Sequence, residues 1–418
     1  MRSILNFFIS GLVVVFSGSV KYYLWLGLLL TLMLFGAYGY SIQFKEGLVA
    51  TGMHDHVSWG IYISNFIFFV GVAAGGVMLV IPAYIMKDKD FSKVVLIGEG
   101  LAVAALVMAL MFVLADLGGV MRFWHMLPGI GYFHFPESML TWDVLVLNGY
   151  LALNLAIPAY ILYCRYNGRE PVKKIYVPFV ILSVFWAFGI HLVTAFLLVS
   201  VAANSFWSSA ILGPRFLASA FTAGPALIIV IFSIIRQASA YKISDDTINK
   251  LAMVMMFAAY ANLVMLFSEI FKEFYWNSEH TAHARYLFFG LDGHHAVTPF
   301  IWSSVVSNVL ATLLISFRRL RENHAVLVPA CLVLFGAIWV EKGLGLVIPG
   351  FIPSQLGEIV EYLPTFVEIF VTLGIIGFGL FTLTALLKVF IWVETGAISS
   401  KGGFAEQMDA AIKKKDQT

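Results

Sequence analysis

Charged residues and cysteine are both scarce in this chain of 418 residues. Asp, Glu, Lys and Arg make up only 12% of it, about half the charged fraction of a soluble globular domain. The formal net charge of +2 gives no reason to expect a nucleic-acid partner. Two cysteines are too few for an iron–sulfur cluster, which needs about four thiolates, or for a disulfide framework. We expect Cys164 and Cys331 to be inert buried thiols.

Hydrophobic residues are abundant instead, at 60% of the chain with a mean hydropathy of +0.89. Apolar runs of about 18 or more residues predict transmembrane helices, because a helix of about 20 residues crosses the hydrocarbon core. Such runs predict an all-α polytopic membrane protein with about ten spans, at residues 22–40, 57–86, 93–121, 140–164, 175–201, 214–236, 249–276, 297–317, 325–347 and 363–393. The segment before them lacks an A-x-A-like cleavage site, so we expect a retained amphipathic lead-in.

Positive charges are concentrated in every second loop, which indicates the orientation of the spans in the membrane. The even loops carry Lys87, Lys89, Lys93, Arg165, Arg169, Lys173, Lys174, Arg236, Lys242, Lys250, Arg318, Arg319 and Arg321. The odd loops are poorer in Lys and Arg, and richer in His, aromatic residues and Gly. The pattern therefore predicts a protein of the cytoplasmic membrane with both termini in the cytoplasm and the odd loops outside.

Three ionisable residues, Asp116, His191 and Glu269, interrupt the apolar runs. The predicted orientation places all three in the outer part of their spans, where buried charges usually face a bundle interior or a watered cavity. Further polar or aromatic residues are predicted near the same level. These are Trp59, Asn65 and Asp143 in spans 2 and 4, and Arg122 and His125 just beyond Asp116. A shared depth on several helices predicts one outer pocket lined by these eight residues.

Structural roles for the same residues remain open alternatives. Asp116 could form an ion pair with Arg122 or Lys272, and Glu269 could pair with Lys272 on its own helix. His191 could be a buried histidine bonded to a backbone carbonyl. The spacing Gly71-x-x-x-Gly75 is also typical of ordinary close packing between membrane helices. Each loop histidine, at 54, 56, 280, 283, 294 and 295, could simply be solvated.

The residue types in this predicted pocket favour some chemistries over others. A haem with two axial histidines needs paired imidazoles on facing helices, and only His191 lies deep in a span, so no bound haem is expected. The HDH and HTAH sequences are weak metal signals without thiolates, so no metal site is expected. A quinone needs hydrogen-bonding and proton-exchanging groups beside an apolar corridor. Asp116, His191 and Glu269 meet that need, whereas the electrons would have to enter or leave through a partner.

Several stretches resemble the NrfD/PsrC family of membrane subunits. They are WGIYISNFIFFVGVAAGG, ADLGGVMRFWH, the surroundings of His191, FSEIFKEFY and EYLPTFVEIFVTLGIIGFG, in this order along nearly the whole chain. The segment LVIPGFIPSQLGEIVEYLPTFVEI looks most like the DsrP or Hdr-like menaquinol oxidoreductase branch.

The resemblance implies two four-helix bundles with flanking helices. The corresponding parts would be a lead and first span (1–56), bundles at 57–201 and 214–347, a last span (363–393) and a cytoplasmic tail (394–418). It implies menaquinone as substrate, with no haem or iron–sulfur cluster held by this chain. The implied partners are an outer ferredoxin-like subunit with several iron–sulfur clusters, a multihaem cytochrome c, a b-type cytochrome membrane subunit and an Hdr-like cytoplasmic subunit.

These expectations lead to one main hypothesis and two rivals. The main hypothesis is a quinone-reactive subunit of a respiratory iron–sulfur complex in dissimilatory sulfur metabolism. In it, Asp116, His191 and Glu269 handle protons, while Arg122, His125 and the loops 41–56 and 277–296 form the pocket rim and docking surface. The rivals are a proton-translocating or transporter-like subunit without quinone chemistry, and a plain membrane anchor. Ionisable groups gathered on one side disfavour a transporter with midplane sites, and an anchor needs no buried carboxylates.

Overall fold

The computed structural model describes residues 2–201, 204–276, 281–354 and 356–400 and is built almost entirely of helices. Ten of its helices are long and apolar enough to cross a membrane, at 19 to 31 residues each. All ten predicted spans have a counterpart among them, which confirms an all-α polytopic membrane protein.

The helices have the following bounds. The first half contains α1 (Arg2–Val15), α2 (Val20–Glu46), η1 (Gly47–Ala50), α3 (Ile61–Gly75), α4 (Val77–Val80), η2 (Ile81–Ile85), α5 (Lys89–Asp116), η3 (Val120–Met126), α6 (Met139–Tyr166) and α7 (Lys173–Val199). The second half contains η4 (Ser205–Trp207), α8 (Leu212–Ala238), α9 (Asp245–Trp276), α10 (Thr281–Phe289), α11 (Thr298–Ser316), α12 (Arg318–Arg321), α13 (His324–Trp339), η5 (Val340–Leu344), α14 (Gly345–Val347), η6 (Ile348–Phe351) and α15 (Phe366–Glu394).

The first span is longer than predicted. Helix α2 and the 3₁₀ turn η1 continue to Ala50, through residues assigned from sequence to a loop at 41–56. The polar residues there are accommodated by tertiary contacts: Gln43 is buried, donates from Nε2 to the Ala115 carbonyl at 2.6 Å and accepts from the Tyr62 hydroxyl at 2.7 Å. Partners on other helices therefore let the helix extend beyond its apolar run.

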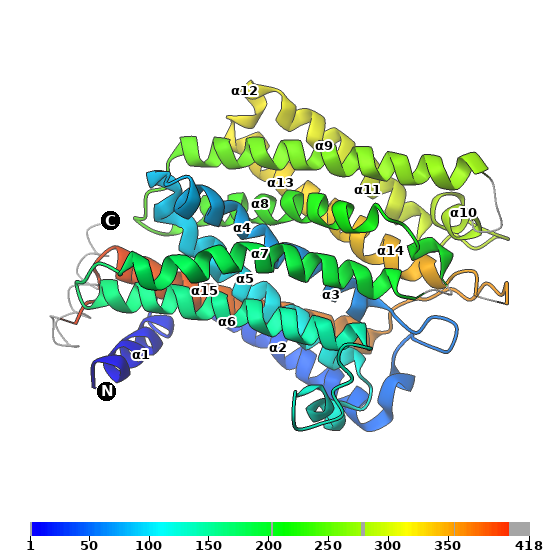
Figure 1. The fold of residues 1–418 in the computed structure, drawn as a ribbon, viewed down its shortest axis with the longest axis horizontal. Coiled ribbons are helices and arrows are strands. Elements are labelled where there is room, and N and C mark those ends of the chain that lie inside the picture. Colours follow the sequence, from blue (N-terminus) through cyan, green and yellow to red (C-terminus); the bar gives the residue numbers. More distant parts are fainter. Residues whose placement is uncertain (1, 202–203, 277–280, 355, 401–418) are drawn as a thin grey trace.

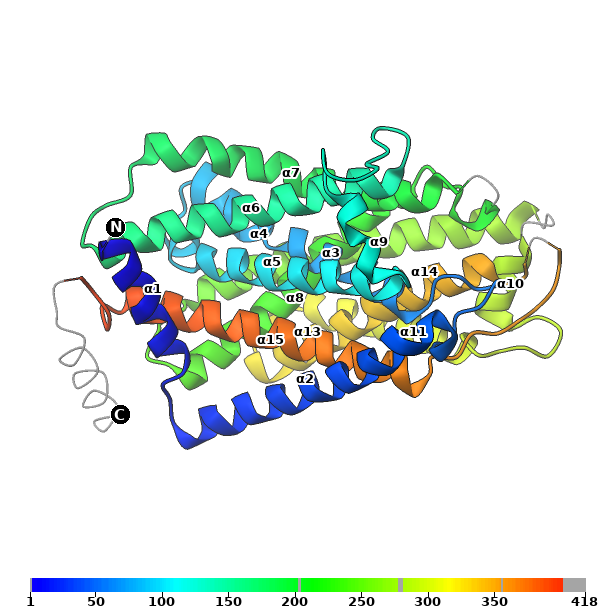
Figure 2. The same ribbon diagram turned by 90° about the horizontal axis from the view of Figure 1, so that it is seen from below.

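The long helices run side by side along the longest axis of the molecule, which gives it two distinct ends (Figures 1 and 2). The histidine-rich end consists of α10, η3 and the connections 47–60, 117–138, 204–211, 290–297 and 352–365. The basic end consists of the connections 86–88, 167–172, 239–244 and 317–323. They correspond to the predicted outer and cytoplasmic loops, and the orientation itself stays a prediction.

Two rings of four helices form the centre of the fold. Helices α3, α5, α6 and α7 contact one another in a closed ring, as do α8, α9, α11 and α13. The rings meet mainly along α3 and α8, while α2 and α15 pack together and cover α5 from outside. The domain boundaries assigned from sequence stay a prediction, and residues 401–418 of the tail lie outside the described residues.

Glycine lets the two rings approach closely. A Cβ on Gly75 would lie 2.4 Å from the Cα of Gly224, so only glycine at both positions permits this contact between α3 and α8. The other glycine of the Gly71-x-x-x-Gly75 pair faces side chains rather than a backbone, and it belongs to the site described below. The spacing thus combines one packing contact with one site contact.

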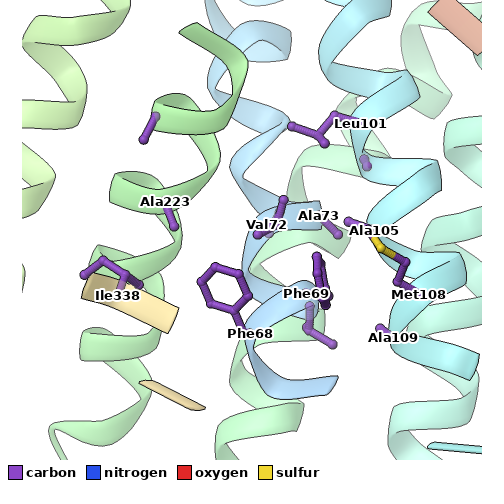
Figure 3. Close-up of a cluster of buried hydrophobic side chains, with 14 of the residues drawn as sticks. Phe68, Phe69, Val72, Ala73, Leu101, Ala105, Met108, Ala109, Ala223 and Ile338 are labelled. Carbon is purple, nitrogen blue, oxygen red and sulfur yellow. The ribbon is translucent and has the colours of Figure 1, made fainter. Parts of the chain in front are cut away.

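An apolar core fills the junction of α3, α5, α8 and α13 (Figure 3). Phe68 packs edge-on against Phe335 with ring centroids 4.9 Å apart, and Phe69 stacks on Phe112 at 5.9 Å. Leu101 and Ala105 of α5 belong to the same cluster. Such close-packed interiors move little, so this core holds the polar side chains next to it, described below, in fixed positions.

Candidate functional site

A buried ion-paired group lies inside the second helix ring, toward the histidine-rich end. Arg215, in the first turn of α8, donates from Nη1 to Glu269 Oε2 of α9 and from Nη2 to Glu341 Oε1 at 2.9 Å. The side chains of Arg215, Glu269 and Glu341 are 12%, 17% and 1% exposed. Glu269 therefore pairs with Arg215 and not with Lys272, which pairs with Glu273 instead.

Glu341 is the most completely satisfied member of this group. Besides the arginine, Asn262 Nδ2 donates to Glu341 Oε1 at 3.0 Å, and Asn308 Nδ2 donates to Oε2 at 3.1 Å. Three donors from α8, α9 and α11 thus converge on one carboxylate. A buried charge is tolerated when its oxygens are filled in this way, so Glu341 is a fixed anchor for Arg215.

A single π-helical turn, η5, places two adjacent charged residues in different parts of the interior. Glu341 points to Arg215, whereas Lys342 donates to the Phe216 carbonyl at 3.3 Å and lies 4.2 Å from the centroid of the Phe216 ring. In a regular α-helix, neighbours diverge by about 100°, and π turns are common at functional sites. Two acids and two bases are buried here, so their formal charges cancel.

Lys342 connects this group to His191 of the first ring. A Cβ on Gly71 would lie 3.0 Å from Lys342 Nζ and 3.9 Å from His191 Nε2, so both nitrogens face the same point on α3. His191 is fully buried, at 0% exposure. The absence of a side chain at Gly71 therefore leaves room where the lysine and the imidazole approach each other.

Several buried polar atoms around this point have no hydrogen-bond partner among the described residues. They are Asn65 Nδ2 and Asp143 Oδ2. The ring nitrogens of His191 also lack a well-formed hydrogen bond, although the imidazole approaches the Ala187 backbone on its own helix. Their residues are otherwise held in place: Asn65 Oδ1 accepts from Trp339 Nε1 at 2.8 Å, and Asp143 Oδ1 accepts from Thr194 Oγ1 at 2.9 Å. Buried polar atoms are nearly always paired in proteins, so such a set marks a place that binds something polar.

Trp59, the predicted aromatic residue, belongs to a cap over the histidine-rich end of the two rings. Its ring stacks on Trp207 at 5.6 Å and meets Phe351 edge-on at 5.8 Å. Trp207 is fully buried and donates to the Leu346 carbonyl at 2.8 Å. The cap therefore covers the junction of the two rings on the histidine-rich side of η5.

A narrow cleft reaches the ion-paired group from the side of α9 and α10. Its lining includes Arg215, Glu269, Glu341, Lys272, Glu273, Leu287, Phe288 and Leu346. Its volume is about 50 Å³, which suits one or two water molecules, whereas ligand pockets usually measure about 300–1,000 Å³. A ring-sized ligand would therefore reach Glu269 only after side chains at the cleft had moved.

Asp116 lies in a different polar group from Glu269. Its near charged neighbour is Glu368 of α15, and its Oδ1 has no hydrogen-bond partner in the described chain. Glu368 itself accepts from Gly52 N at 2.7 Å and from the Tyr362 hydroxyl at 2.5 Å. No ion pair of Asp116 with Arg122 or Lys272 occurs among the described residues. The structure thus places Asp116 between α5, α2 and α15, away from the cleft.

Arg122 and His125 also lie apart from the cleft, in the exposed turn η3. His125 stacks between Trp124 and Tyr132, with ring centroids 3.8 and 5.2 Å away, and accepts from Tyr132 N at 3.3 Å. Figure 1 places this connection at the lower edge of the molecule, whereas α9 and α10 lie at the upper edge. Of the eight predicted residues, Glu269 lines the cleft. That His191, Asn65, Asp143 and Trp59 share a pocket with it stays a prediction.

Some loop histidines pair with acids of the connection 352–365. His56 lies 3.5 Å from Glu358, and His294 lies 3.2 Å from Glu361. Partial burial would raise the pKa of Glu361, but hydrogen bonds from the Ala296 amide at 2.8 Å, from His294 and from the Tyr286 hydroxyl at 3.2 Å outweigh it and lower that pKa. Within the predicted loop 277–296, His280 and the rest of 277–280 lie outside the described residues.

A further buried carboxylate, Glu99 of α5, lies toward the basic end. It is 3% exposed, and its Oε2 has no hydrogen-bond partner in the described chain. Its position on α5 is next to Gly98, whose carbonyl approaches Gly76, the residue between α3 and α4. Gly76 follows Gly71 by five residues, which corresponds to about 7 Å along a helix. On the side toward Gly71, the contact between α3 and α5 is apolar (Figure 3).

Sequence reasoning missed five charged members of these groups: Arg215, Glu341, Lys342, Glu99 and Glu368. The signal was present, because LGPRF, WVEKGLG and LIGEGLAV each place a charge within or at the edge of an apolar run. A charge in such a run is itself a functional-site hypothesis in a membrane protein.

The fold and the site thus define a multi-pass membrane protein with an ion-paired polar group buried in one half. The family described as "Polysulphide reductase, NrfD" matches residues 49–352, and the chain belongs to this NrfD family.

Three curated relatives match this chain at 23% to 26% identity. A putative dimethyl sulfoxide reductase membrane subunit from Halobacterium salinarum is 23% identical over 404 residues, covering 87% of this chain and 90% of its own length. A selenate reductase subunit from Mesobacillus selenatarsenatis is 26% identical over 56% of this chain and 61% of its own. The Hdr-like menaquinol oxidoreductase integral membrane subunit of Archaeoglobus fulgidus is 23% identical, with coverage of 59% and 58%. These relatives are subunits of oxidoreductases.

Proposed function

We propose that this chain is the quinone-reactive membrane subunit of an oxidoreductase complex and exchanges electrons between menaquinol and an iron–sulfur partner. The single observation that carries this proposal is the cleft that leads to Glu269, backed by the buried unpaired atoms of Asn65, Asp143 and His191. The name of the Archaeoglobus relative supports menaquinol as the substrate. The proposed place in dissimilatory sulfur metabolism rests only on the resemblance of LVIPGFIPSQLGEIVEYLPTFVEI to the DsrP branch.

The residues of the site can take up the protons of such a reaction. Oxidation of one quinol yields one quinone, two protons and two electrons. We assign the first contact with the headgroup to Glu269, because its carboxylate faces the cleft. Lys342 and His191 lie further inside and can pass protons on, because both nitrogens face Gly71. Arg215 and Glu341 hold Glu269 in position.

In this proposal the two electrons leave through a partner, because two cysteines are too few to ligate an iron–sulfur cluster in this chain. We propose a ferredoxin-like iron–sulfur subunit docked on the histidine-rich end. The cleft and Glu269 both lie in that half of the molecule. With the basic end in the cytoplasm, this end would face outward from the cytoplasmic membrane.

The test is quinol oxidation by the purified complex with single substitutions in the site. Glu269→Gln and His191→Ala should each lower the rate by about 10²–10⁴-fold, the usual contribution of a general acid or base. Glu322→Gln is the matched control, because this carboxylate pairs with Arg318 on the exposed basic end. Extraction of the wild-type complex should recover bound menaquinone.

Unchanged quinol oxidation in both site variants would defeat the site assignment. Recovery of no quinone, together with unchanged rates, would defeat the quinone function itself and leave the membrane anchor as the explanation. If Glu269→Gln prevented assembly of the complex, the ratio of subunits in the purified material would show it. The rate of quinol oxidation by His191→Ala would then decide the site assignment.

Proton translocation without quinone chemistry is a second candidate, favoured by Glu99. This buried carboxylate lies between the level of Gly71 and the basic end, where the quinone proposal gives it no role. Proton uptake by liposomes that contain the chain without quinone, abolished by Glu99→Gln, would support this candidate. Equal uptake by wild type, Glu99→Gln and empty liposomes would remove it.

A further inference from the structure

Helices α6 and α7 run side by side along one edge of the molecule and enclose a groove between them (Figure 2). Its volume is about 470 Å³, within the range of ligand sites. Nearly all of its lining is apolar. The main lining residues are Gly149, Ala152 and Ala156 of α6 and Phe179, Leu182 and Trp186 of α7.

The groove is shaped by small residues at helical spacing. Gly149, Ala152 and Ala156 fall on one face of α6, three and four residues apart. A Cβ on Gly149 would lie 2.6 Å from the ring of Trp186, so glycine is required where this indole crosses to α6. Trp186 is fixed there because its Nε1 donates to the Val146 carbonyl at 2.8 Å. The tryptophan therefore closes one end of the groove.

The length of the groove matches half of a bilayer. It extends from Gly149 to Tyr160 along α6, a rise of about 16 Å, and half of the hydrocarbon core measures about 15 Å. The groove runs from the middle of α6 toward the basic end. This is the span of one extended acyl chain in one leaflet.

Unpaired positive charges lie beyond the open end of the groove. Arg169, Lys173 and Lys174 are exposed and form no ion pair with the described residues, although the carboxylate of Glu170 is nearby in sequence. Some other basic residues at this end are paired, such as Arg165 with Glu394 and Lys250 with Asp88. The three unpaired cations beside the groove would attract an anionic group to this corner.

We propose that the groove between α6 and α7 binds one acyl chain of an anionic phospholipid, whose phosphate lies on Lys173, Lys174 and Arg169. Apolar lining accounts for the chain and the three unpaired cations account for the headgroup. The isoprenoid tail of a quinone fits less well, because its headgroup would then lie at the end opposite Glu269. The proposal does not depend on the quinone function.

The experiment measures lipid binding by the purified complex in detergent. Phosphatidylglycerol and phosphatidylcholine of equal chain length are titrated, and bound lipid is counted by native mass spectrometry. The wild type should prefer phosphatidylglycerol. The double variant Lys173→Gln/Lys174→Gln should lose about fivefold in affinity per charge removed, with no change for phosphatidylcholine. The exposed Arg319 of α12 supplies the matched control Arg319→Gln, because Figure 1 shows α12 at the top of the molecule, away from α6 and α7.

A second variant tests the groove itself. Ala152→Phe fills the groove and should abolish tight binding of one lipid, whereas Leu155→Phe, on a lipid-exposed face of α6 outside the groove, should not. Equal affinity of wild type and Lys173→Gln/Lys174→Gln for phosphatidylglycerol would overturn the proposal. Displacement of a quinone rather than a phospholipid by Ala152→Phe would overturn it as well. The lysine variant keeps the proposal testable if Ala152→Phe does not fold.

Discussion

Replacing Arg215 with methionine should be among the most destabilising single changes in this protein. The guanidinium is 12% exposed and holds two carboxylates, Glu269 and Glu341. Methionine fills a similar length of apolar space, so the packing loss is small compared with the electrostatic loss. Both carboxylates would remain buried, one of them at 1% exposure, without their cation.

The magnitude follows from the cost of leaving a buried charge unpaired. Breaking a buried ion pair by removing one partner typically costs about 3–5 kcal/mol. We expect Arg215→Met to lie in that range, which changes the folding equilibrium at least about 100-fold. Glu269→Gln removes one of the two stranded charges. Its addition to Arg215→Met should therefore restore about 1–3 kcal/mol instead of adding a further loss.

The assay is equilibrium unfolding in mixed micelles, followed by circular dichroism, for the single and double variants. Arg318→Met is the control, because this arginine pairs with Glu322 while its own side chain is 81% exposed, and exposed pairs contribute about 0–1 kcal/mol. If Arg215→Met unfolded within about 0.5 kcal/mol of the wild type, a range typical of neutral surface changes, the account of the site would be refuted. Strict additivity of the two substitutions would refute the coupling.

Three further predictions concern packing, reactivity and pH. Gly75→Val should cost at least about 1–3 kcal/mol in the same unfolding assay, because its Cβ would lie 2.4 Å from Gly224 Cα; an unchanged midpoint would contradict this contact. Contrary to the expectation from sequence, Cys164 is partly exposed, so a maleimide should label it, whereas it should label the fully buried Cys331 only after unfolding. Because the pKa of Glu361 is lowered on folding, its contribution to stability should be present above its unfolded pKa of about 4.3 and should fade as the pH falls further. This prediction would be contradicted if the difference in stability between wild type and Glu361→Gln increased as the pH was lowered from 7.

The span pattern was predictable because the bilayer imposes it locally. Each crossing needs about 20 apolar residues with satisfied backbone groups, so runs such as 249–276 identify a helix without any tertiary information. The observed helix Asp245–Trp276 differs from that prediction by a few residues at its start. Exceptions occur where tertiary contacts add partners, as for Gln43 at the end of α2.

The site was only partly predictable. Glu269 and His191 stand out in sequence because each interrupts a long apolar run. Their partners do not, because Arg215 is 54 residues before Glu269, and Glu341 is 126 residues after Arg215. Position along a span predicts depth but not the direction in which a side chain faces. Asp116 has a suitable place on α5 and yet faces α2 and α15.

By itself, the amino-acid sequence determined that this chain crosses a membrane about ten times, with most of its histidines in one set of loops and most of its lysines and arginines in the other. Those features depend on the free energy of placing each residue in lipid or water, which is a local property. Only the tertiary structure decided that Arg215 joins Glu269 to Glu341 and that Lys342 meets His191 beside Gly71. These pairings depend on how whole helices rotate and pack, and on one π turn, which no single apolar run encodes.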